Sequence, residues 1–189
     1  MNDIAKDFGN SGAGINPAAP HYAHPQADAI MEECRDILST ISEGKRLLAF
    51  ADEKSIKIEI ITGKEPGYRF ALPDLAYLIC PLNTKAVDLP EMAVCLGLAI
   101  REMEQPHAGI FRAIPALHGE QTPNILFRQM LDITLEMCRI VSEFEAVGNH
   151  TKLVDLLEKL GHGEIYKGFK SGKNQEELAK IYSISINAV

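Results

Sequence analysis

One stretch constrains the fold of this chain more than any other: residues 88–105, DLPEMAVCLGLAIREMEQ, have the pattern of a buried helix. Apolar residues recur there every three or four positions, as they do on a helix face that packs into a core. They are Met92, Cys95, Leu96, Ala99, Ile100 and Met103. Pro90 suits the first turn, and Pro106 is expected to end the helix. We therefore expect a core built around this helix.

The other periodic segments predict an α+β fold in which helices dominate. Further helices are expected over residues 26–41, 45–53, 124–147, 151–160 and 175–182. Ser42 and Asn174 are the expected N-caps of two of them. Strands are predicted at 55–63 and at about 76–82, where Pro81 favours a short strand or an edge strand. The segment between these strands is expected to form a loop or a short strand, and the sequence leaves their pairing open.

Three segments lack clear periodicity. Residues 1–24 are rich in Gly, Asn, Ala and Pro and predict a flexible tail, which leaves residues 25–189 as a single domain. Residues 106–123 form a long connection with three prolines, which is typical of a lid, a binding loop or a locally disordered segment. Residues 160–173, LGHGEIYKGFKSGK, are Gly-rich and basic. We expect a turn-rich connection there, with anion binding as the alternative.

The composition excludes several classes of function. A net charge of −7 and a pI near 5.4 disfavour nucleic acid as a partner, because the chain repels a phosphate backbone. No apolar run approaches the roughly 18 residues that span a bilayer, and no secretory apolar region follows the N-terminus, so we expect a cytoplasmic protein without a membrane partner. The cysteines stand singly, which predicts buried thiols rather than a zinc or redox site. They are Cys34, Cys80, Cys95 and Cys138.

The sequence contains no GxSxG elbow, P-loop or GxGxxG motif. Its six histidines include no pair at the i, i+4 spacing that places two metal ligands on one helix face. A metal site built from them is therefore disfavoured. They are His21, His24, His107, His118, His150 and His162.

Three segments together resemble the small zincin-like metallopeptidase domains of bacterial hypothetical proteins. They are SIKIEIITG, GYRFALPDLAYLICPLNTKAVDLPEMAVCLGLAIREMEQ and CRIVSEFEA. In that family a strand and a short edge segment precede a helix with HExxH, and a later helix carries an Arg and an EADA-like motif. The resemblance covers about Ile56 to Ala146 and is one of layout and apolar pattern, while single residues agree only in patches.

The family's motif is degenerate in this chain. Two His four residues apart and a later acid would bind zinc, and the Glu beside the first His would take a proton from the bound water. The resemblance places Arg101 and Gln105 at the His positions, Glu102 at the general-base position, and Glu143 at the position of the later acid. Arginine stays protonated, and glutamine is a poor zinc ligand.

A register one residue earlier places Ile100 and Glu104 at the His positions and Arg101 at the general-base position. That register gives no zinc site either, because isoleucine has no donor atom.

The resemblance therefore implies a zincin frame that has lost its metal, in which Arg101 takes the metal's place and pairs with Glu143. We expect no cofactor and a binding or regulatory role towards an unknown protein or peptide ligand. One alternative is an active zinc peptidase that uses ligands from the 106–123 connection with Glu143. Another is a helical scaffold protein unrelated to peptidases, in which the polar end of the 88–105 helix is simply exposed to solvent.

Overall fold

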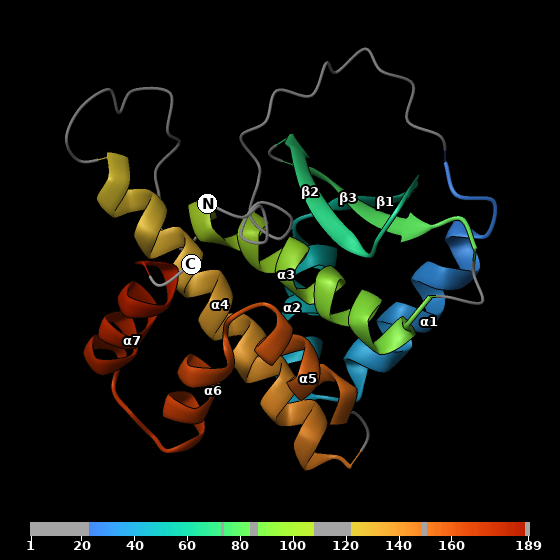
Figure 1. Ribbon diagram of the computed structural model, residues 1–189. Helices are drawn as coiled ribbons and strands as arrows, with labels where there is room; N and C mark the ends of the chain where they lie inside the picture. Colours follow the sequence, from blue (N-terminus) through green and yellow to red (C-terminus); the bar gives the residue numbers. More distant parts are fainter. Residues whose placement is uncertain (1–22, 73, 84–86, 108–121, 149–150, 188–189) are drawn as a thin grey trace.

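A computed structural model describes residues 23–187 except 73, 84–86, 108–121 and 149–150 (Figure 1). Two helices, three strands and five further helices follow one another in this part of the chain. They are α1 (Ala27–Ser39), α2 (Ser42–Glu53), β1 (Lys57–Gly63), β2 (Gly67–Leu72), β3 (Leu75–Pro81), α3 (Leu89–His107), α4 (Thr122–Ala146), α5 (Thr151–Lys159), α6 (Gly163–Lys170) and α7 (Gln175–Asn187). This arrangement confirms the predicted α+β fold in which helices dominate.

The three strands form one mixed sheet in the order β1-β3-β2. β3 pairs in parallel with β1 and antiparallel with β2, so that Leu78 lies between Ile60 and Tyr68. The expectation that Pro81 would shorten this strand or place it at an edge is therefore wrong, since β3 is the central strand. Pro81 is the last residue of β3 and lies opposite Gly63. The strand pairing ends there, so the missing N–H of proline removes no further hydrogen bond from the sheet.

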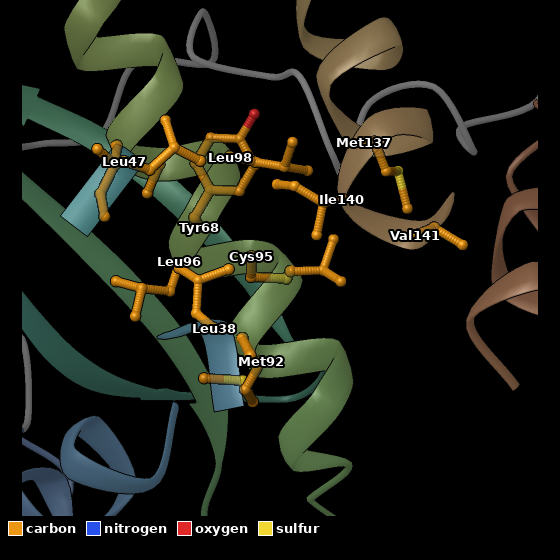
Figure 2. Close-up of a cluster of buried hydrophobic side chains, with 14 of the residues drawn as sticks. Leu38, Leu47, Tyr68, Met92, Cys95, Leu96, Leu98, Met137, Ile140 and Val141 are labelled. Atoms are coloured by element: carbon orange, nitrogen blue, oxygen red, sulfur yellow. The ribbon is translucent and has the colours of Figure 1, made fainter. Parts of the chain in front are cut away.

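Helix α3 is the centre of the core. All residues from Met92 to Ile100 are buried, so this helix is covered on every side and not only on the face that its periodicity indicates. Strands β2 and β3 lie on one side of it, and α1, α2 and α4 contact its other sides. Figure 2 shows Leu38 and Ile140 in the cluster around this helix. Gly97 allows their close approach, because a Cβ there would lie 2.7 Å from Cδ1 of Ile140.

Several element ends differ from those predicted. Pro106 lies inside the last turn of α3, which continues to His107. Ser42 is the first residue of α2 and caps nothing; the N-cap position belongs to Ile41. Asn174 does cap α7 as predicted, because its Oδ1 accepts a hydrogen bond from the N–H of Glu177 at 3.0 Å.

The segment predicted as a turn-rich connection contains helix α6. Its glycines have packing and capping roles that the sequence pattern does not distinguish from turns. Gly168 is buried, and a Cβ there would lie 3.0 Å from the side chains of Leu178 and Ile181 on α7. Gly161 and Gly172 adopt positive φ angles at the ends of α5 and α6.

Two residues of the predicted tail belong to the folded part. Ala23 forms a bridge with Ile61, and the N–H of His24 donates to the carbonyl of Ile60 at 3.0 Å. The His24 ring is buried, with Nε2 3.3 Å from the Pro81 carbonyl and Nδ1 accepting from the N–H of Gln26. Both ring nitrogens thus have protein partners, and His24 is a packing residue. His21 and the rest of the predicted tail lie outside the described residues.

The four cysteines are free and buried, as predicted. Burial raises the pKa of Cys34 and of Cys138 to about 12, so both thiols stay protonated at neutral pH. Among the helices in the described ranges, none is long and apolar enough to cross a membrane.

Candidate functional site

The C-terminal part of α3 changes from apolar to polar after Ile100. Helical spacing puts Arg101, Glu104 and Gln105 on one side of the helix, at positions i, i+3 and i+4. That side lies next to α4 and α2. Arg101 and Gln105 are the two residues that the predicted resemblance places at the His positions of the zincin motif.

Arg101 and Gln105 both bind one carboxylate, that of Asp132 on α4. The guanidinium of Arg101 donates to Asp132 through Nε at 3.0 Å and through Nη2 at 2.8 Å. Gln105 Nε2 donates to Asp132 Oδ2 at 2.8 Å, and its side chain is buried. Two residues four apart on one helix thus converge on an acid of a later helix. A bidentate arginine pair of this kind fixes geometry as well as charge.

Asp132 is attached to a closed ring of charges that joins α2, α3 and α4. Each arginine of the ring contacts two glutamates, and each glutamate contacts two arginines. The order around the ring is Arg46, Glu43, Arg139, Glu136, Arg101 and Glu104, which returns to Arg46. The two longest contacts are 3.8 Å, from Arg139 to Glu43 and from Arg101 to Glu136. Each of the three helices contributes at least one residue of each sign.

The ring carries one carboxylate too many, since three arginines face three ring glutamates and Asp132. The side chain of Glu136 is 1% exposed, and its Oε1 has no hydrogen-bond partner in the described part of the chain. Burial, together with the adjacent Glu43 carboxyl group, raises the pKa of Glu136 to about 8. Glu136 therefore keeps a proton at neutral pH, beside the carboxyl group of Glu43. This proton removes the excess negative charge.

Glu143 does not pair with Arg101, and this predicted ion pair is wrong. Its Oε2 accepts a hydrogen bond from the backbone N–H of Glu43 at 2.9 Å. That N–H lies in the first turn of α2, where backbone donors lack partners within the helix and a negative charge is favourable. Glu143 thus supplies the cap that Ser42 does not, and Asp132, about three turns earlier on α4, is the acid that holds Arg101.

Glu102 lies on another side of α3, facing the sheet. Its carboxyl group interacts with the hydroxyl of Tyr68 on β2, and burial raises the pKa of Glu102. Figure 2 shows Tyr68 among the buried side chains of the core. The residue that was predicted at the general-base position is therefore turned away from Arg101 and its ion pairs.

Asp132, Glu136, Glu43 and Arg46 were missed in the sequence, and Arg139 was noted only as the Arg of the segment CRIVSEFEA. Asp132, Glu136 and Arg139 recur at spacings of four and three along a helix that is otherwise largely apolar. That spacing shows that they share one side of α4 and could have indicated a common polar partner. Nothing in the sequence pairs them with Glu43 or Arg46 on α2.

The residues brought together do not fit a zinc ion. A guanidinium offers only N–H donors and stays protonated, and the Gln105 amide nitrogen is engaged with Asp132. Within the described ranges, no group of three or more His, Cys, Asp or Glu side chains is placed to hold a metal. His162 lies beside Tyr182, with ring centroids 6.3 Å apart, and burial lowers its pKa. His118, His150 and the side chain of His107 are outside the described residues.

The chain matches no protein-family model, no curated protein and no solved structure. The resemblance to zincin-like domains therefore stays a prediction that rests on sequence layout.

Proposed function

We propose that this protein is a metal-free, non-catalytic relative of the zincin-like metallopeptidases, which acts as a cytoplasmic binding or regulatory module. One observation carries the proposal: Arg101 and Gln105, at the positions of the two His ligands, converge on the Asp132 carboxylate of a later helix. In a metallopeptidase of this family, the two His and a later acid would meet around zinc in the same way.

The surroundings of α3 support the proposal. A zincin frame needs the motif helix beneath a small sheet and beside the later helix, and α3 contacts β2, β3 and α4 (Figure 1). The guanidinium of Arg101 supplies the positive charge that a divalent ion would otherwise supply between the helices. Because Glu102 faces Tyr68 instead, no carboxylate at the general-base position is directed at this point. The free, buried thiols are in keeping with a reducing compartment.

The first experiment restores the missing ligands. The double substitution R101H/Q105H turns residues 101–105 into an HExxH sequence, with Asp132 opposite as the third ligand. If the frame is that of a zincin, the double variant binds about one zinc per chain, and adding D132N weakens zinc affinity because it removes the charge of the third protein ligand. The unaltered protein should contain no stoichiometric zinc. Plasma mass spectrometry of protein purified without chelator, with zinc titration of each variant, measures both.

The single variants R101H and Q105H are the matched controls, because each disturbs the ring or the Asp132 contact while supplying only one imidazole. Circular dichroism establishes that each variant is folded before its metal content is compared. A folded double variant that binds no more zinc than the single variants contradicts the zincin frame. Stoichiometric zinc in the unaltered protein contradicts the metal-free role and favours the alternative of an active enzyme.

A further inference from the structure

A cavity of about 420 Å³ lies between α4, the end of α6 and the start of α7. This volume is within the range of pockets that bind small molecules. Apolar side chains from all three helices line part of it: Leu135, Phe169 and Leu178. Hydrogen-bond donors line another part: Arg139, Lys173 and Gln175. The cavity thus offers an apolar wall beside basic and amide groups.

The most weakly paired charge in this cavity is positive. Two acids, Asp132 and Glu136, also line it, but each is neutralised from within the protein. Asp132 is bound by Arg101 and Gln105, and Glu136 is paired with Arg139 at 2.5 Å. The ammonium of Lys173, in contrast, has one ion-pair partner in the described ranges, Glu177 at 3.9 Å, and both side chains are nearly half exposed. A ligand that complements this charge is an anion.

The backbone holds Lys173 firmly at the cavity. Its N–H donates to the carbonyl of Gly168 at 3.1 Å, and the N–H of Gly172 donates to Phe169 at 3.0 Å, which closes α6 in a Schellman motif with Gly172 at φ +76°. The next residue, Asn174, exchanges two hydrogen bonds with Glu177 in a capping box. Lys173 therefore lies between two fixed helix ends, so less ordering is needed when a ligand binds.

We propose that this cavity binds the C-terminal residue of a peptide whose last side chain is large and apolar. The apolar side chain would contact Leu135, Phe169 and Leu178, and the terminal carboxylate would pair with Lys173, with Arg139 as a second donor. The inference rests on the proposed binding role and gives its ligand a chemical class. One weakly paired ammonium beside an apolar wall suits a single carboxylate better than the multiple charges of a phosphate group.

The probe is a fluorescent pentapeptide pool with leucine fixed at the last position and the other positions randomised. Fluorescence anisotropy compares the free acid with the C-terminal amide. We expect the amide to bind at least about tenfold more weakly, because it lacks the charged acceptor. K173Q should weaken binding of the acid to a similar degree. K167Q is the matched control: it removes one exposed lysine of α6 that does not line the cavity, and binding should not change.

Three results would overturn the inference: a pool that does not bind, an acid and an amide that bind equally, or equal losses in K173Q and K167Q. Free leucine and decanoate are tested as competitors beside an unlabelled pentapeptide. If either small acid displaces the pool at a concentration at which the pentapeptide does not, the ligand is a small carboxylic acid instead. The metal experiment has a separate readout. A metal-free protein with no peptide affinity would refute this cavity's assignment and leave the zincin frame standing.

Discussion

At the scale of single residues, Glu136 combines nearly complete burial with an ionisable group. Its partners come from three helices: Arg139 on its own helix, Arg101 on α3 and Glu43 on α2. A second carboxylate beside a buried one favours the protonated form, since both cannot be charged without repulsion. The proton on Glu136 is thus as much a part of the contact between α2 and α4 as the arginines are.

This proton makes stability depend on pH. The pKa of Glu136 rises from its ordinary 4.5 to about 8 on folding, so between these values the folded protein holds a proton that the unfolded chain releases. The free energy of unfolding should therefore fall as pH rises from about 4.5 to about 8, and Glu136 should add no further change above that.

Urea denaturation at several pH values measures this dependence. E136Q keeps the shape of the side chain and a hydrogen-bond donor but has no titrating group. Its free energy of unfolding should therefore fall less steeply between about pH 4.5 and pH 8. E158Q, at an exposed position on α5, is the control and should follow the unaltered protein. Identical slopes in E136Q and the unaltered protein would show that Glu136 does not hold the proton.

At the scale of elements, the turn between α1 and α2 depends on one glycine. A Cβ at Gly44 would lie 1.8 Å from the backbone carbonyl oxygen of Leu38, which is far inside van der Waals contact. The obstacle is backbone rather than a side chain that can rotate away. Glycine is thus required for α2 to fold back against the end of α1.

We expect Gly44→Ala to destabilise the protein by about 1–3 kcal/mol, as overpacking at a buried site commonly does, although alanine is the better helix former. Urea denaturation monitored by circular dichroism measures the change. Ser42→Ala, two residues earlier and exposed without a capping hydrogen bond, should change stability by no more than about 0.5 kcal/mol. Equal stability of Gly44→Ala and the unaltered protein would mean that the α1–α2 turn relaxes freely.

At the scale of the whole molecule, an apolar core around α3 and a charged ring at its end hold α2, α3 and α4 together. The ring is polar and partly exposed, so its contribution depends on how strongly its members are coupled rather than on any one pair. Arg46 and Glu104 form its α2–α3 contact and can be tested without disturbing the core.

A double-mutant cycle of R46Q and E104Q measures this coupling. Each single variant should be destabilised, and the double variant should lose less than the sum of the two, with an interaction free energy of about 0.5–3 kcal/mol. The pair Lys180 and Glu176 on α7 is the control, because both side chains are highly exposed and their coupling should stay below about 0.5 kcal/mol. Strict additivity for Arg46 and Glu104 would mean that the ring has no collective role.

Much of this architecture is predictable from the sequence, because apolar periodicity reports burial directly. It located α3, α4 and two strands of the sheet. It did not predict α6, whose glycines resemble turn residues although Gly168 is needed for close packing against α7. Nor could it identify Asp132, rather than the expected Glu143, as the partner of Arg101. Both lie on α4, and their distances from α3 follow from how the two apolar helices pack, which no local pattern encodes.

A closed circuit in which acidic and basic side chains alternate has no terminal member. Removing any one of these side chains leaves two neighbours without one of their partners, whereas exchanging an adjacent acid and base preserves the alternation only if the exchange continues all the way round. Homologues of this chain should therefore change these six positions jointly, by coordinated loss or replacement, and isolated substitutions among them should be rare. Their covariation would trace the contact among three helices in lineages whose structures have not been determined.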